Sequence, residues 1–191
     1  MDLTDLLQGA LGNQMVEGIK GQLGIDESQA KSAVSAAIPV LMSALNKNVQ
    51  EGGGASLLNA LNKHDGSILE NLGGFLSSPD LSDGAGILSH VLGGKQSQVE
   101  NSIGKSSGLS SAQIGKILMI LAPIVMGYLG NQKKKSGLDE GGLGDLLGSL
   151  TSGSGGSVGM DILEQVLSSG NKSSGGGLMG KILGGLFGGK K

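Results

Sequence analysis

The chain of 191 residues contains no cysteine, no tryptophan and no arginine, and it has only three aromatic side chains. The lack of cysteine excludes disulfides and thiol chemistry. Arginine is the usual bidentate reader of phosphate and guanine, so its absence, together with a formal net charge of −2, disfavours recognition of nucleic acids. Because 38 residues are glycine and so few are aromatic, the core has to be built from aliphatic side chains.

The sequence also lacks a segment that matches an export signal or a full membrane span. It begins Met1-Asp2-Leu3, without a basic start or a sustained apolar run, and we therefore expect a cytoplasmic location. The most membrane-like run, residues 117–129, contains Pro123 and Gly127 and is shorter than the roughly 20 residues that a spanning helix needs. A buried core helix explains this run better.

What the chain does contain is an internal repeat at an offset of 84 residues. The first copy contains Gly24, Gln29, Pro39, Met42 and Leu45, and the second contains Gly108, Gln113, Pro123, Met126 and Leu129. These residues are helix caps, prolines and apolar packing positions. The repeat therefore predicts an architecture of two similar halves and carries no information on chemistry.

Each copy contains the start signal of a long helix. Asp26-x-x-Gln29 and Ser110-x-x-Gln113 both match a capping box, in which the cap side chain and the glutamine side chain bond to each other's backbone amides. We therefore predict long helices that begin directly after Asp26 and Ser110.

The two long helices differ in how much of their surface is apolar. Residues 27–47 have one apolar stripe, which predicts a peripheral helix, whereas residues 111–130 are apolar on every side. The second helix has to be covered all round, so we expect it at the centre of the fold or at an interface. Pro39 and Pro123 lie in mid-helix, where each removes a backbone hydrogen bond, and we expect both helices to bend there.

A shorter helix is predicted ahead of each long one. Ser97-x-x-Glu100 matches a further capping box, and Asn13 occupies the corresponding position in the first half. Gly24 and Gly108 then supply the turn into the long helix. The expected fold is all-α, built on a duplicated helical hairpin of a short helix, a glycine turn and a long, proline-kinked helix.

Five further segments share a short apolar pattern. In each, two adjacent apolar residues are followed four positions later by one or two more, as in residues 57–61, 68–72, 87–92, 162–167 and 178–183. The pattern predicts one broad apolar face on a helix of about two turns. Helices this short are unstable alone and have to dock on other elements.

The composition changes after residue 135, where glycine and serine become frequent. We therefore predict a duplicated helical domain over residues 1–135, with halves at about 1–50 and 85–135 connected by short helices at 55–84. Residues 136–191 are expected to form a flexible Gly/Ser-rich region with short apolar helices.

The blocks around the two histidines resemble a known bacterial family. They read His64-Asp65-Gly66-Ser67-Ile68-Leu69 and Asp83-Gly84-x-x-Ile87-Leu88-Ser89-His90-Val91-Leu92-Gly93, followed by Gly108-Leu109-Ser110 and by Leu121-Ala122-Pro123-Ile124-Val125-Met126-Gly127. Their order and spacing resemble the family called domain of unknown function 937, with its YidB-like proteins. The resemblance covers about residues 1–135 and the glycine- and leucine-rich tail. It implies a small all-helical protein, sometimes described as homeodomain-like, and no particular activity.

The sequence offers few candidates for catalysis or for metal binding. His64 and His90 each lie near an Asp-Gly pair, but neither has a second histidine or a cysteine nearby, and a zinc site needs three or four ligands. We expect His90 to bond a carbonyl group or to pack within its helix. We predict no catalytic, cofactor-binding or metal-binding residues, no cofactor and no small-molecule substrate, and so a protein that is not an enzyme. A deep pocket with several polar groups would favour an enzyme again.

The functional hypothesis is a non-enzymatic interaction or assembly protein that presents apolar helices to copies of itself or to a protein partner. The expected interaction residues lie in the central helix and in the tail, and they are Leu118, Ile120, Ile124, Tyr128, Leu178, Ile182, Leu186 and Phe187.

Two other functions remain open, namely binding to a membrane surface and binding to DNA. The tail also has an interpretation without any function. Residues 178–191 combine apolar side chains with lysines, as a helix on a membrane surface does. A homeodomain-like DNA binder would use Lys133, Lys134 and Lys135, but the apolar helix before them lacks base-reading side chains, which makes nucleic acid an unlikely partner. The tail could also be a glycine-rich end without stable helix.

Overall fold

A computed structural model of the chain describes residues 9–152 and 156–169. Within these ranges the regular structure is helical, which confirms the predicted all-α class. The α-helices are α2 (Ala10–Leu23), α3 (Glu27–Asn48), α4 (Gly54–Leu61), α5 (Ser67–Glu70), α6 (Leu72–Ser77), α7 (Leu81–Val91), α8 (Gln96–Ser107), α9 (Ser111–Ser136), α10 (Glu140–Ser152) and α11 (Gly156–Ser169). A π-helical turn, η1 (Val49–Gly53), precedes α4, and a 3-10 turn, η2 (Gly93–Lys95), precedes α8.

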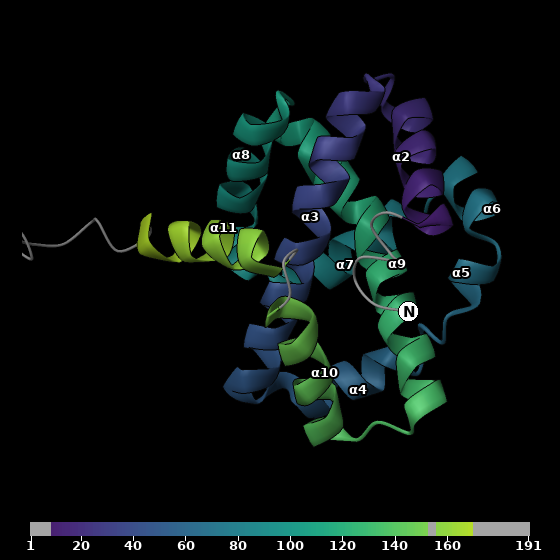
Figure 1. Ribbon diagram of the computed structural model, residues 1–191, viewed down its shortest axis with the longest axis vertical. Helices are drawn as coiled ribbons and strands as arrows, with labels where there is room; N and C mark the ends of the chain where they lie inside the picture. Colours follow the sequence, from purple (N-terminus) through teal and green to yellow (C-terminus); the bar gives the residue numbers. More distant parts are fainter. Residues whose placement is uncertain (1–8, 153–155, 170–191) are drawn as a thin grey trace, which may run out of the picture.

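The two long helices, α3 and α9, pack against each other and form the centre of the fold (Figure 1). Helices α2, α8, α10 and α11 pack on α3, while α4, α5, α7 and α8 pack on α9. Pro39 lies inside α3 and Pro123 inside α9, and both helices continue beyond their proline. The bend expected at each proline stays a prediction.

The starts of both long helices confirm the predicted capping boxes. The Asp26 amide donates to the Gln29 side-chain oxygen at 3.2 Å, and the Ser110 amide donates to that of Gln113 at 3.0 Å. Because each box satisfies backbone donors that lie outside the helical ladder, α3 begins at Glu27 and α9 at Ser111.

The starts of the two shorter helices differ from the prediction. Helix α8 begins one residue ahead of Ser97 with Lys95 at its cap, and α2 begins at Ala10, so that Asn13 lies inside it. The predicted caps at these two positions are therefore wrong. The chain enters α8 from η2 with Lys95 already in helical geometry, whereas a capping residue needs an extended backbone. Both helices end, as expected, at a left-handed glycine before the long helix, Gly24 (φ 62°) or Gly108 (φ 71°).

Helix α3 is not peripheral, contrary to the prediction from its single apolar stripe. Every residue from 36 to 46 is buried. The cover on its outer side comes from α10 and α11, which bury Leu143, Leu147, Leu163 and Val166. The sequence pattern failed here because small residues such as alanine and serine can be covered without forming an apolar stripe.

The described residues beyond position 135 belong to the same packed body as those before it. Helix α9 runs through this position to Ser136, α10 packs on α3 and α4, and α11 packs on α3 and α8. A buried hydrogen bond of 3.2 Å from the Asn46 side-chain amide to the Thr151 hydroxyl joins α3 to α10. The predicted tail, with Leu178, Ile182, Leu186 and Phe187, lies outside the described residues.

Candidate functional site

A groove between α4 and α7 has a mixed apolar and polar lining and a volume of about 930 Å³. We refer to it as the α4–α7 groove. Its floor consists of Leu45 from α3 and Met126 from α9, both almost fully buried. Apolar side chains on its walls come from α4 and α7, and they are Leu57, Ala60, Ile87 and Val91. Polar side chains, including both histidines of the chain, surround this apolar strip.

Helix α7 has two faces, one that packs against α9 and one that lines the groove. Gly84 and Leu88, four residues apart, are buried on the side that packs against α9. The groove is lined by the next face of the helix, which carries Asp83, Ile87 and Val91 at intervals of four residues. Since Gly84 has no side chain, α7 lies directly against the α9 backbone at Met119, and this close approach positions the groove wall.

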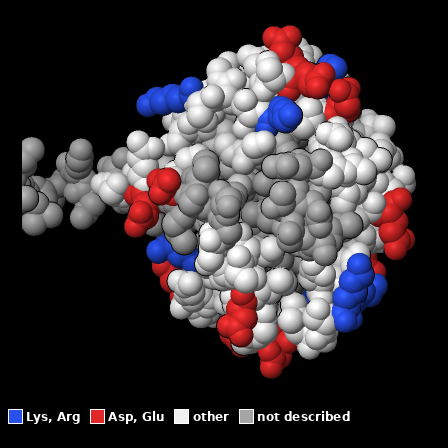
Figure 2. Space-filling view, in the orientation of Figure 1, with Lys and Arg blue, Asp and Glu red and all other residues white. Residues whose placement is uncertain are grey.

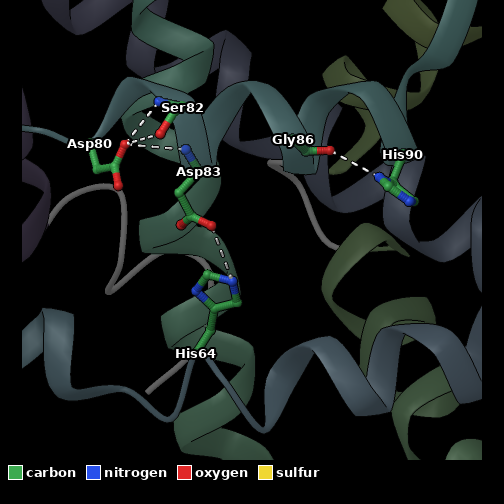
Figure 3. A network of polar contacts seen from close by, with 6 residues as sticks. All are labelled: His64, Asp80, Ser82, Asp83, Gly86 and His90. Carbon is green, nitrogen blue, oxygen red and sulfur yellow. Dashed lines mark hydrogen bonds and ion pairs between the residues drawn. The ribbon is translucent and has the colours of Figure 1, made fainter.

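The two histidines lie at different parts of the groove and make different contacts. His64 follows α4 and points toward Asp83, with 3.9 Å between its Nε2 and the carboxylate Oδ1 (Figure 3). His90 lies on α7 about two turns after Asp83, and its Nδ1 is 3.0 Å from the Gly86 carbonyl. A carbonyl only accepts, so we assign the proton to Nδ1, and Nε2 of the neutral ring is left as an acceptor. This contact confirms the expectation that His90 bonds a carbonyl group.

The carboxylate of Asp80 caps the first turn of α7. Asp80 accepts hydrogen bonds from the Ser82 hydroxyl at 2.6 Å, the Ser82 amide at 2.9 Å and the Asp83 amide at 3.3 Å (Figure 3). The Ser82 hydroxyl, followed by the two amides, holds the pKa of Asp80 below its usual range. This geometry is that of an N-cap.

The groove provides two different metal-ligand types in His64 and Asp83, but within residues 9–152 and 156–169 no group of three or more His, Cys, Asp or Glu side chains could hold a metal ion. A zinc or transition-metal site needs at least three protein ligands at short distances.

Two lysines near the end of α9 bond to α4 and to the residues that follow it. The Lys134 ammonium is 3.0 Å from the Asp65 carboxylate, and Lys133 donates to the Leu58 carbonyl at 3.1 Å and to the Asn62 side chain at 2.6 Å. The hydrogen bond from Lys134, then those from Ser67, lower the pKa of Asp65 to about 2. Two of the three lysines proposed for DNA contacts thus have partners in the chain, and Figure 2 shows lysines and acidic side chains interspersed around the face it presents.

Replacing Asp65 by asparagine is expected to reduce stability at neutral pH and to matter less in acid. The folded state holds the pKa of Asp65 below the ordinary value of 3.8, so the contact stabilises the fold above about pH 4 and is lost as the pH falls toward 2. The Tm difference from wild type, followed by circular dichroism, should shrink through this window. Lys134→Met removes the same ion pair and should behave alike, whereas a difference independent of pH would contradict the assignment.

The interaction residues predicted in the central helix are buried inside the described fold. Leu118, Ile120, Ile124 and Tyr128 are at most 2 % exposed, and the surrounding helices belong to the same chain. Leu178, Ile182, Leu186 and Phe187 lie outside the described residues. Sequence reasoning missed the groove itself, although both histidine blocks that carry the family resemblance line part of it.

One described helix is long and apolar enough to cross a membrane, and it is α9. Its most apolar window has a mean hydropathy of 1.7, and 78 % of that window is buried inside the fold. The core helix of a soluble protein meets the same criteria, so this finding is weak support for a span.

Comparison with models of protein families gives a match to most of the chain. The model of the family described as a bacterial protein of unknown function, DUF937, matches residues 5–132, more than half of the 191-residue chain. No curated protein and no solved structure matches the chain. The matched range includes α2 to α8, most of α9 and the whole α4–α7 groove, and it excludes α10 and α11.

Proposed function

Because the chain belongs to the bacterial family of unknown function DUF937, its role has to be argued from its own residues, and we propose that it is a non-enzymatic interaction protein whose α4–α7 groove binds an apolar helical segment. The observation that carries this proposal is the apolar strip of the groove, with its buried floor and half-buried walls. Leu45 and Met126 form the floor, and Ala60, Ile87 and Val91 leave apolar surface accessible from the side.

The shape of the groove favours a helix as its occupant. Two helical walls present side chains at intervals of three and four residues, the spacing at which a docked amphipathic helix places its own anchors. On α7 the lining residues from Asp83 to Val91 extend over about 12 Å, the length of two helical turns and a little more. Uncharged Asn59 and Ser56 on α4 provide a polar rim, which is typical of such docking sites.

The polar groups of the groove support binding more than catalysis. The separation of 3.9 Å between His64 and Asp83 is longer than a hydrogen bond. The Ser82 hydroxyl and the His90 Nδ1 both serve the helix that carries them. The Asp80 carboxylate beside the Ser82 hydroxyl also accepts the Ser82 and Asp83 amides, so it serves as a helix cap and not as a base kept free to take a proton.

A synthetic amphipathic peptide of leucine and lysine, patterned for one apolar helical face, is the probe that tests this function. Added to the isotope-labelled full chain, it is expected to shift the backbone amide resonances of α4 and α7 selectively. Ile87→Lys, which places a charge on the apolar wall, should weaken binding about tenfold or more. Ala85→Lys places the same charge on an exposed position of the same helix and should leave binding unchanged.

Two outcomes would overturn the proposal. One is a set of shifts that maps outside the groove, and the other is an equal loss of affinity in the two lysine variants. A scrambled peptide of the same composition controls for attraction between its lysines and surface carboxylates, since it keeps the charge and loses the apolar face.

A further inference from the structure

The short apolar pattern found five times in the sequence has a described docking place in four of its copies. These copies lie in α4, in α5 with the start of α6, in α7 with the residue after it, and in α11. Each places at least one apolar side chain in the core, namely Leu61, Leu72, Leu88 and Leu163, all at most 4 % exposed. The pattern therefore behaves in this chain as a docking element, as expected for helices too short to be stable alone.

The fifth copy lies at residues 178–183 and extends to residue 187. Its apolar pairs, Leu178-Met179, Ile182-Leu183 and Leu186-Phe187, recur every four residues. On a helix these pairs would form one face about 13 Å long, close to the length of the α7 wall from Asp83 to Val91. The α4–α7 groove offers apolar surface of matching length between two helices.

The position at which α11 ends favours a groove on another molecule. Figure 1 shows α11 leading the chain outward, away from α4 and α7. Eight residues, 170–177, separate Ser169 from the apolar segment, and they extend over at most about 29 Å. Leu163 of α11 lies beside Asn48, His90 and Val91 at one end of the groove, and beyond Leu163 the helix runs away from it (Figure 1). To reach the groove of its own molecule, this connection would therefore have to reverse direction.

We propose that residues 178–187 of a second copy of this chain occupy the α4–α7 groove. The inference rests on the proposed function of the groove and names its occupant. Because the groove and the tail are different surfaces, each molecule donates one tail and receives one, and this head-to-tail contact extends into chains of molecules. The groove is the acceptor, and the apolar pairs around Ile182 are the anchors.

Disulfide trapping tests this contact, since the native chain has no cysteine and two introduced thiols are the only ones present. The full chain with Asn59→Cys and Ile182→Cys places one thiol on the groove rim and one in the tail. A disulfide forms only when the Cα atoms approach within about 7 Å. Mild oxidation is expected to give a ladder of dimers and longer species on a non-reducing gel.

The matched control combines Ala55→Cys with Ile182→Cys. Ala55 is also exposed on α4, outside the groove lining, so this variant should give several-fold less cross-linked product. Mixing the Asn59→Cys chain with the Ile182→Cys chain should give a mixed disulfide between the two, and circular dichroism of each variant checks the fold.

Three results would overturn the proposal. A cross-linked monomer in place of the ladder would assign the groove to the tail of the same molecule. Equal products from both cysteine pairs would indicate random collision. Absence of cross-links, together with flotation of the full chain on phosphatidylglycerol vesicles, would assign the tail to a membrane surface. If the leucine and lysine peptide still binds the groove in any of these cases, the proposed function of the groove stands. Only the assignment of residues 178–187 of a second copy as its occupant is then wrong.

Discussion

Replacing Gly84 by alanine is expected to lower the free energy of unfolding by about 3 kcal/mol. Gly84 is buried on the face of α7 that packs on α9, and an added Cβ would overlap the backbone carbonyl of Met119. A backbone atom inside the central helix cannot move aside as a flexible side chain can. Helix α7 would therefore have to move away from α9, which also shifts Ile87 and Val91 in the groove wall.

The matched control for this experiment is Gly86→Ala in the same helix. A Cβ at Gly86 meets no atom within 4 Å, so the substitution should raise stability by about 0.5–1 kcal/mol through helix propensity. Urea unfolding followed by circular dichroism measures both variants. A loss of stability of similar size in both would show that close packing of α7 on α9 does not control the effect, and Gly84→Ala should also weaken binding of the leucine and lysine peptide.

Replacing Leu147 by alanine is expected to cost about 3 kcal/mol of stability. This side chain on α10 is 0 % exposed, and α10 packs on α3, α4 and α11. Truncation would leave a cavity that the neighbouring helices cannot fill completely. The large effect would place residues beyond position 135 within the cooperative core and not in a flexible region attached to it.

Leu146→Ala is the control, because Leu146 is the adjacent residue on α10 and is only partly buried. It should lose clearly less stability, on the order of 1 kcal/mol, since less apolar surface is removed from the core. Equal small losses in the two variants, measured by urea unfolding, would contradict the packing of α10 on α3 and would support a separate C-terminal region.

The local start and stop signals were readable from the sequence because they depend on residues within one helical turn. The capping boxes at Asp26 and Ser110 and the glycines at positions 24 and 108 mark helix ends that the fold retains. The same signal at Ser97 does not mark a helix start, because the turn η2 leads into α8 in helical geometry and Ser97 lies inside the helix. A cap signal works only when the capping residue itself has an extended backbone, as Asp26 and Ser110 have.

The sequence by itself determined the all-α class, the positions of the two long helices and the family, since these depend on periodicity, capping and motif spacing. Only the tertiary structure decided which surfaces are covered. Helix α3 is central because α10 and α11 pack on it. The groove joins Leu45, Leu57, Ile87 and Met126, which lie on four different helices. Such contacts form between residues far apart along the chain, and no local pattern encodes which helices pack together.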